Sequence, residues 1–430
     1  MRPSYRPDLL RWAVALVIGA TPHHLRAQTL PPTDTVLARL TAEAVRANPS
    51  LEASRAMARA AAIRVRPAGA LPDPMLTAGV MDLTLPRFGF HESDFTEVDV
   101  ELSQEFLWPG TLGARTRGAR ADAGMRQADI ATRGREITTR TAELYYQLRY
   151  AVTARETLQR QRVLLAAAVE IATTRYATAS APQSDPLQAR VAVARLDTED
   201  ADLAAQESEL RADLKSLRNV RGADSLIVEP ILPESISAGL HAAGLGNNIL
   251  PDSLPSHPRL VARRAAVEAA EQRVRVEQLG ARPDFTIMTR YGARPLGADF
   301  FSASIGVRLP MWASRKQSRL AAAARADADA ARATEQEEAA AIGAEVRSAL
   351  SQVTSAQTRL HLLTTQVIPS AQATVDAVLR DYRVGRGAFL TVLAAEDSRY
   401  RAELEAAMVA AQHLSHLVML QQLLLPEDPQ

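Results

Sequence analysis

The sequence predicts a mainly α-helical protein built from two tandem structural repeats, each with two strands of the kind found in membrane β-barrels. Two observations lead to this fold class. Each repeat has a very long helical pattern that ends in a turn-forming stretch and is followed by a returning helix. Each long helix is also preceded by two segments in which polar and apolar residues alternate. Aromatic residues make up 4% of the 430 residues and hydrophobic residues 47%, a composition that suits closely packed, alanine-rich helices.

The stretch that organises the chain is 381–395, which reads DYRVGRGAFLTVLAA. Gly385 and Gly387 lie between two helical patterns and can adopt backbone conformations that other residues adopt at an energetic cost. A degenerate copy, RYATASAPQSDPLQA at 175–189, lies about 206 positions earlier. Both stretches are therefore predicted to be tips of helical hairpins, and the chain is predicted to contain an internal repeat.

The first 27 residues have the pattern of an export signal. Three arginines precede a short apolar stretch at 12–20, and Leu25, Arg26 and Ala27 form a small-residue cleavage site. Removal of residues 1–27 would change the formal net charge from +1 to about −2, which gives no basic patch for nucleic acid. The absence of cysteine excludes disulfides and thiolate metal sites.

The first repeat is predicted to span 28–218. Asn48 and Pro49 have the pattern of a helix N-cap followed by proline at the first helical position. Two strands at about 75–86 and 96–107 precede a long helix at about 110–178, the tip at 175–189 and a returning helix. In the long helix, apolar residues recur every seven positions, which predicts packing against partner helices: Ile130, Ile137, Leu144, Ala151, Leu158 and Leu165.

The strand at 96–107 shows the clearest alternation. Val98, Val100 and Leu102 point to one face, whereas Glu97, Asp99 and Glu101 point to the other. An amphipathic surface strand or a barrel strand with lipid outside and water inside would both fit. After the signal, no stretch reaches the roughly 18 apolar residues of a membrane-spanning helix. A membrane crossing would therefore need strands, with the three carboxylates facing the lumen of a barrel.

Residues 219–256 lose the periodicity and are predicted to form a linker. The second repeat, 257–425, has strands at about 284–292 and 299–310, a long helix at about 314–383 and the tip at 381–395, followed by a tail at 426–430. Arg308 lies on the polar side of the last strand and is predicted to face the same lumen. Pro369 lies inside the long helical pattern and predicts a kink there.

Taken together, these features resemble the TolC-like outer-membrane efflux proteins over nearly the whole chain. The resemblance rests on the duplicated order of elements and on three short motifs: Tyr382-Arg-Val-Gly385 followed by Leu393, Asn48-Pro49-x-Leu51, and Pro72-Asp73-Pro74. It implies a homotrimer in which each chain gives four strands to one twelve-stranded β-barrel, continued by a long α-helical tunnel in the periplasm. The two strands of the first repeat most resemble the heavy-metal (CusC- or CzcC-like) branch.

The resemblance also implies a function and partners. The chain would be a passive duct in the outer membrane of a Gram-negative-type bacterium, exporting small molecules or metal ions. Its tips would contact a periplasmic adaptor (a membrane fusion protein), which is linked to an inner-membrane pump of the RND type. The family is not enzymatic and needs no cofactor. The remaining contacts would be with outer-membrane lipid, and none would be with nucleic acid.

A gate at the tips is a further implication of the resemblance. In the family a tyrosine, an arginine and aspartates close the inner end of the tunnel. Tyr382 matches the tyrosine, and Asp185 matches an aspartate of the first tip. Gly385 lies in the second tip, in the turn that follows Tyr382. A plain helix N-cap would equally explain Asp185, and a packed hairpin aromatic would equally explain Tyr382.

Two departures from the family pattern concern the charges of this gate. Gly387 stands where the arginine is expected, and Arg386 lies one place earlier. Thr391 and Ala394 stand where other members have aspartates. The resemblance therefore supports the tip as a contact end more strongly than as a charge-selective entrance.

Other function classes fit the sequence less well. No catalytic triad, phosphate-binding glycine loop or metal signature is present, and His413 and His416, one helical turn apart, are predicted to be ordinary helix residues and not ligands. A periplasmic coiled-coil adaptor would carry one hairpin between small β-domains, whereas this chain has two hairpins, each after its own strand pair. A secreted structural coiled coil without a pore would not need four alternating strands.

Overall fold

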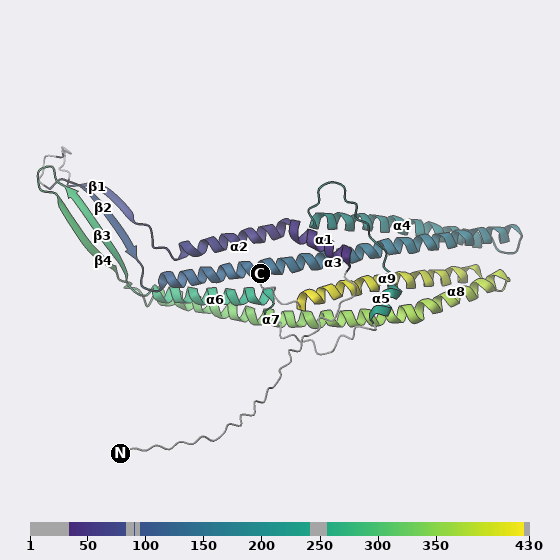
Figure 1. Cartoon of the computed structure of the whole chain (residues 1–430). Helices are drawn as coiled ribbons and strands as arrows, with labels where there is room; N and C mark the ends of the chain where they lie inside the picture. Colours follow the sequence, from purple (N-terminus) through teal and green to yellow (C-terminus); the bar gives the residue numbers. More distant parts are fainter. Residues whose placement is uncertain (1–33, 83–89, 91–94, 241–255, 425–430) are drawn as a thin grey trace, which may run out of the picture. The chain divides into compact units, whose positions relative to one another are not determined.

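The computed structural model describes residues 34–82, 90, 95–240 and 256–424 (Figure 1). The predicted signal peptide at 1–27, most of the second half of the linker (241–255) and the tail at 426–430 lie outside these residues. From Thr35 onward the chain forms one compact unit. Its elements are α1 (Thr35–Ala47), α2 (Pro49–Ala68), β1 (Met75–Met81), β2 (Glu97–Phe106), α3 (Thr111–Ala177), α4 (Ser184–Leu217), α5 (Pro233–Leu240), α6 (Pro258–Leu279), β3 (Asp284–Ala293), β4 (Phe300–Arg308), α7 (Gln317–Leu362), the π-helical turn η2 (Leu363–Val367), α8 (Ile368–Arg383) and α9 (Phe389–Leu424).

The protein is mainly helical and has one four-stranded sheet. A short helix, two strands, a long helical stretch and a returning helix follow one another in each half of the chain. The helix expected at 110–178 coincides closely with α3. The returning helices of the two hairpins are α4 and α9. No helix in the described part of the chain is both long and apolar enough to cross a membrane.

Helix α3 is the central helix of the bundle. It contacts α1, α2, α4, α6 and α9. Most of the residues expected at seven-residue spacing form its buried seam: Ile137, Leu144, Ala151, Leu158 and Leu165 are buried, whereas Ile130 is half-buried, and buried Ala172 continues the series. A helix of 67 residues is about 100 Å long at 1.5 Å per residue. Such a helix needs this continuous packing, because an isolated amphipathic helix in water has little stability of its own.

The second long helix differs from the expected uninterrupted helix at 314–383. It begins at Gln317, after turns at 311–316, and is divided by the five-residue π-helical turn η2 just before Pro369. Proline has no N–H to donate, and its ring clashes with the carbonyl four residues earlier, so the wider turn relieves the conflict. The kink expected at this proline is therefore accommodated by an inserted residue.

The inserted residue also shifts the buried seam of this helix. Val346, Val353 and Leu360 are buried at seven-residue spacing, but Val367, the next position in the series, is 44% exposed. The seam continues one residue later through Ile368, which packs against the core, and then through Val375 and Tyr382, which are buried. The π-turn therefore sets which side chains of α8 face the bundle.

The four strands form an antiparallel sheet in the order β1-β2-β3-β4. Because β2 pairs with β3, the strand pairs of the two halves join into one sheet. Strand β1 ends at Met81 and not near residue 86, because Asp82 has a positive φ of 57° that ends the extended backbone. The remaining residues of the expected strand, 83–86, lie outside the described part. Strand β4 ends at Arg308, shortly before Pro310, which has no N–H for a sheet hydrogen bond.

The two short helices that precede the strands begin with matching caps. The Asn48 side chain accepts a hydrogen bond from the Ser50 N–H at 2.9 Å at the start of α2. At the start of α6, the His257 Nδ1 accepts one from the Arg259 N–H at 3.3 Å. In both helices proline follows the cap at the first helical position. The second cap therefore depends on a neutral imidazole, since a protonated ring has no acceptor.

We expect this cap to make α6 sensitive to acid. Burial, helped by the charges of Arg135 and Arg259 and opposed by Glu345 and Glu338, lowers the pKa of His257 from 6.5 to about 4. The contribution of neutral His257 to the free energy of unfolding is fully present above about pH 6.5. It is lost as the pH falls towards 4, because between these two values the unfolded chain binds a proton that the folded chain does not bind. His257→Asn copies the Asn48 cap without a titrating group.

The measurement is hydrogen exchange of the first-turn amides of α6 at about pH 7.5 and about pH 5, corrected for intrinsic rates. Wild type should lose more protection on acidification than the asparagine variant. Equal losses in the two proteins would show that His257 does not titrate between folded and unfolded states as described.

Candidate functional site

The second hairpin tip, between α8 and α9, is closed by a hydrogen-bonded turn whose left-handed residue is a glycine. Gly385 has a φ of 79°. Its N–H donates to the Tyr382 carbonyl at 3.0 Å, and the Arg386 N–H donates to the Asp381 carbonyl at 2.9 Å. These two bonds and the left-handed residue define a Schellman motif, which satisfies carbonyls at the end of α8.

The first tip, between α3 and α4, has the same turn with alanine in place of glycine. Ala179 has a φ of 54°. Its N–H donates to the Tyr176 carbonyl at 2.9 Å, and the Ser180 N–H donates to the Arg175 carbonyl at 2.8 Å. The degenerate sequence copy therefore keeps the backbone geometry of the glycine-containing tip, although an L-residue in this conformation is strained.

Tyr382 and Asp185 come together at the tips. Tyr382 is only 3% exposed, and its hydroxyl donates to the Asp185 Oδ2 at 3.3 Å. Burial, followed by the negative charge of Asp185, raises the pKa of Tyr382. Its ring packs 5.3 Å from the Phe389 ring, centroid to centroid, and both belong to a small core cluster with Ala172, Ala189 and Val392. The cluster joins residues of α3, α4, α8 and α9.

Asp185 is not the N-cap of its helix. Helix α4 begins at Ser184, and its N-cap residue is Gln183, whose side chain makes no capping hydrogen bond. Asp185 lies in the first turn, where a negative charge is favourable. Its carboxylate accepts the hydrogen bond from the Tyr382 hydroxyl, so Asp185 makes a contact between the two hairpins.

Arg175 is a tip residue that sequence reasoning missed. Its guanidinium carbon lies 4.4 Å from the centroid of the Tyr382 ring. It also donates hydrogen bonds to the carbonyls of Tyr382 and Ser180. Its position as the first residue of the degenerate tip copy was the only available signal. Arg386, which was predicted at the tip, is exposed, and its side chain has no hydrogen bond or ion pair to any described residue.

The predicted charged residues of the strands share one face of the sheet, and partners that the sequence did not reveal neutralise them. Arg290 lies 2.9 Å from Glu101 and 3.6 Å from Asp99, measured between nitrogen and oxygen. Arg294 pairs with Glu97 at 3.2 Å. On the same face Arg308, at the end of β4, pairs with Glu105 at 2.6 Å. The sheet register brings these partners together from separate strands.

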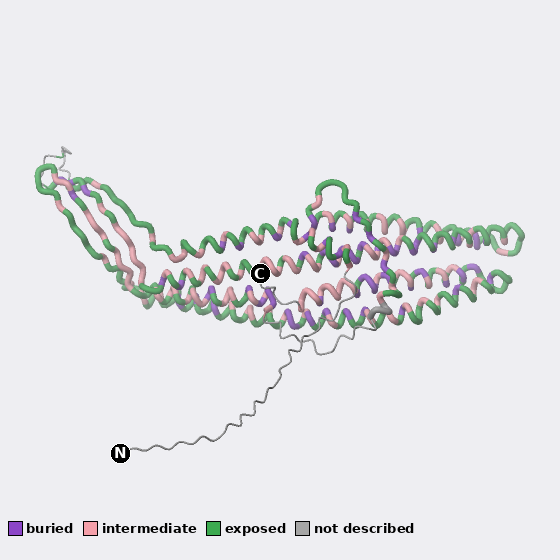
Figure 2. The backbone as a smooth tube through the Cα atoms, in the orientation of Figure 1, coloured by how far each residue is buried: buried purple, intermediate pink, exposed green. Residues whose placement is uncertain are grey.

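The opposite face of the sheet is apolar and uncovered. Its side chains come from all four strands, and many large hydrophobic ones are more than two fifths exposed: Leu76, Val80, Val98, Val100, Leu102, Ile287, Tyr291, Phe301, Ile305 and Val307. Figure 2 shows exposed positions along all four strands. An exposed apolar surface of this extent marks a site that meets another apolar surface or lipid.

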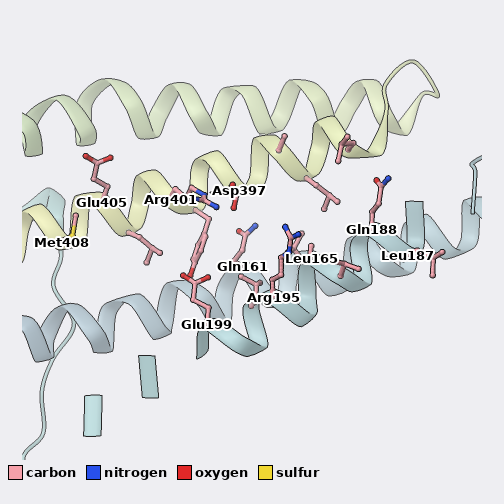
Figure 3. A pocket seen from close by; sticks show the side chains of 18 of the residues that line it. Gln161, Leu165, Leu187, Gln188, Arg195, Glu199, Asp397, Arg401, Glu405 and Met408 are labelled. Atoms are coloured by element: carbon pink, nitrogen blue, oxygen red, sulfur yellow. Dashed lines mark hydrogen bonds and ion pairs between the residues drawn. The ribbon is translucent and has the colours of Figure 1, made fainter. Parts of the chain in front are cut away.

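A groove of about 1080 Å³ lies near the tips between α3, α4 and α9 (Figure 3). Leu187, Gln188 and Arg195 line it from α4, and Asp397 and Arg401 line it from α9. Charges of both signs alternate with apolar residues along this groove. The groove is therefore lined by both charged and apolar side chains of three helices.

Of the two histidines of α9, His413 lies inside the packed bundle and His416 is half-buried. His413 is fully buried, with its Nδ1 3.3 Å from the Val353 carbonyl oxygen of α7. Burial lowers the pKa values of His413 and His416, so both are neutral near pH 7. Among the described residues, no group of three or more histidines or carboxylates is arranged to hold a metal ion.

Comparison with known proteins gives the same fold. Residues 249–424 match the family model described as "Outer membrane efflux protein". The structure of the outer-membrane channel OprN is 19% identical, with a TM-score of 0.78 over 91% of this chain and 90% of its own. VceC from Vibrio cholerae is 20% identical, with a TM-score of 0.77 over 91% of this chain and 96% of its own. A search of curated proteins found no significant match.

The resemblance to TolC-like outer-membrane efflux proteins is confirmed. It is a resemblance in sequence over the second half of the chain and in fold over about nine tenths of it. A CusC structure also matches, with 14% identity and a TM-score of 0.77 over 92% of this chain and 95% of its own. Because this score is no higher than those of OprN and VceC, the heavy-metal branch of the TolC-like proteins stays a prediction.

We expect the two tip turns to respond in opposite directions to exchange of glycine and alanine. Gly385→Ala places a Cβ in the left-handed region and should lower the free energy of local opening by about 1–2 kcal/mol. Ala179→Gly removes the same strain at the first tip and should raise the free energy of local opening. The increase should be smaller than the decrease in Gly385→Ala, because glycine gains more entropy in the open state.

Hydrogen exchange of the turn amides, measured in each variant against wild type, gives these free energies. The two substitutions serve as controls for each other, since they exchange the same pair of residues at matching positions. A loss of stability in both variants would mean that the positive φ values are not what governs these turns.

Proposed function

We propose that this chain is the outer-membrane channel component of a tripartite efflux system. It is a passive duct that exports small molecules or metal ions delivered by an inner-membrane pump and a periplasmic adaptor. It transfers no chemical group, and its contribution is the geometry of a water-filled path. The family model and the fold likeness to solved outer-membrane channels support this proposal.

The main support for the proposal is that the two faces of the sheet differ in polarity. One face exposes large apolar side chains, and the other holds carboxylates paired with arginines. A strand pattern with apolar residues towards lipid and polar residues towards water is characteristic of outer-membrane barrels. Glu97, Asp99, Glu101 and Arg308 would then face the lumen.

The open edges of the sheet account for the proposed trimer. In the described residues, β1 and β4 each pair on one side only, and unpaired backbone groups are too unfavourable to remain in lipid. Pairing β1 of one copy with β4 of the next closes the sheet. Three copies with four strands each give a twelve-stranded barrel, and their helices continue it as a tunnel through the periplasm.

The tips form the other end of the duct. Because the chain leaves the sheet for the helical bundle after β2 and after β4, and the tips close the hairpins at the far end of the bundle, α3 separates barrel and tip by about 100 Å. The tips would contact the adaptor and, in the resting state, narrow the tunnel through Tyr382 and Asp185. Residues 1–27 would direct export and be removed, and the mature chain would lie in the outer membrane of a Gram-negative-type bacterium.

The first test places a charge on each face of β4. Ile305→Lys adds a charge to the apolar face, where lysine near the bilayer midplane costs about 2–4 kcal/mol. Ser304→Lys adds the same charge one residue earlier, on the polar face. Wild type and Ser304→Lys should be recovered as heat-modifiable outer-membrane trimers, and Ile305→Lys should be strongly depleted from them.

This pair separates the duct from a secreted coiled coil. Both positions are exposed in the single chain, so a protein that works in water would tolerate both lysines equally. Recovery of wild type in the soluble periplasm, or equal recovery of both variants as trimers, would contradict the proposed duct.

The second test concerns the gate. Tyr382→Phe combined with Asp185→Ala removes the hydroxyl, the carboxylate and the hydrogen bond between them, and should raise single-channel conductance in planar bilayers by allowing the tips to separate. Tyr176→Phe is the matched control, because Tyr176 takes the corresponding place in the first tip but is 45% exposed. Unchanged conductance of the double variant would remove Tyr382 and Asp185 from the gate.

A further inference from the structure

We propose that Arg175 is the positioning residue that holds the second hairpin tip against the first within a single chain. The inference rests on the proposed function, in which separation of the tips opens the duct. It goes beyond that function by assigning the closed position to a residue of α3, on the first tip, and not to an arginine of the second tip.

Arg175 contacts the second tip in two ways. Its guanidinium lies over the face of the Tyr382 ring, 4.4 Å from the centroid, where a cation is attracted by the negative face of the ring. It also donates to the Tyr382 carbonyl through Nη1. One side chain of the first hairpin therefore contacts both the ring and the backbone of one residue in the second hairpin.

Arg175 also stabilises its own turn. Its Nη2 donates to the Ser180 carbonyl at 3.2 Å. Ser180 and Tyr382 both belong to the hydrogen-bonded turns that end α3 and α8. The guanidinium therefore supplies a positive charge and N–H donors near the C-terminal ends of two helices, where exposed carbonyls favour both.

The chemistry of this contact requires arginine. A planar guanidinium can stack on a ring and donate to separate carbonyls at its edge at the same time, whereas the ammonium of lysine is a point charge. The guanidinium lies beside the turn, since a Cβ added at Gly385 would be at van der Waals distance, 3.8 Å, from the Arg175 Nη2. Glycine at 385 thus serves the left-handed turn and also borders the guanidinium.

Arg175 and Asp185 hold Tyr382 from two sides. Arg175 covers the ring face, Asp185 accepts from the hydroxyl at 3.3 Å, and Phe389 packs at 5.3 Å. Both charged residues belong to the first hairpin. The second tip cannot move away from the first without breaking the contacts of Tyr382 with Arg175 and Asp185 and exposing a residue that is now 3% exposed. The contacts that specify the closed position therefore include a set made inside one chain.

Arg386 provides the matched control. It carries the same charge at the second tip, but it is exposed and its side chain makes no polar contact with the described residues. Arg175→Gln and Arg386→Gln change the net charge of the tips equally. Only the first removes the contact with Tyr382, so a difference between the two variants reports that contact and not the charge.

The experiment measures the distance between the tips of one chain. The protein has no cysteine, so Gln183→Cys on the first tip and Ala388→Cys on the second, both exposed, introduce a single pair for spin labels. Labelled chains are diluted with unlabelled wild-type chains in full-length assemblies, so that distances within one chain dominate. Pulsed electron spin resonance then gives the distance distribution, and the same variants without labels are measured for single-channel conductance.

Wild type and Arg386→Gln should give one narrow, short distance. In Arg175→Gln a longer distance should appear, with the ratio of separated to closed tips rising roughly tenfold, as loss of about 1.4 kcal/mol of contact energy would give, and conductance should rise with it. Arg175→Lys, which keeps the charge and tests for misfolding, should also give the longer distance, because it lacks the planar fork.

Two results would overturn the inference. In one, Arg175→Gln keeps the wild-type distance and conductance. In the other, Arg386→Gln separates the tips as much as Arg175→Gln does. Failure of the proposed function looks different: wild type would form no channels, while the distance between the tips would still lengthen in Arg175→Gln.

Discussion

Close packing along α3 is the constraint on which the rest of the structure depends. A single helix of this length is stable only when a continuous seam is buried, and α3 buries its seam against helices from both halves of the chain, among them α2, α4, α6 and α9. Small residues such as Ala151 and Ala172 let these partners approach closely. Since α3 begins directly after β2 and ends at the first tip, its packing also fixes the distance between sheet and tips.

Exact register along the second long helix is equally important, and it is set by one inserted residue. The π-turn before Pro369 shifts the buried seam from Val367 to Ile368. From there the seven-residue spacing brings Val375 and then Tyr382 onto the inner side of α8. A regular α-helix would have presented a different side of α8 to the bundle. The contact of Tyr382 with Asp185 and Arg175 therefore follows from a local backbone irregularity several turns away.

Charged residues have different roles in the sheet and at the hairpin tips. On the sheet, arginines pair with carboxylates across strands, so that a strongly charged face can exist beside an apolar one. At the tips, one arginine and one carboxylate contact an aromatic residue that is buried in a small apolar cluster. The ion pairs on the sheet suit a surface that faces water. The contact at the tips suits an interaction that holds two hairpins together and can be broken.

The sequence by itself determined the mainly helical class, the element order, the seam of α3 and the matching tips, because seven-residue spacing, strand alternation and turn residues are local signals. It also singled out Tyr382 and Asp185. Only the tertiary structure identified Arg175, Arg290 and Arg294 as partners, since these contacts join residues far apart in the chain. The early end of β1 and the π-turn also escaped the sequence, because backbone strain at Asp82 and Pro369 is resolved by neighbouring geometry that composition does not encode.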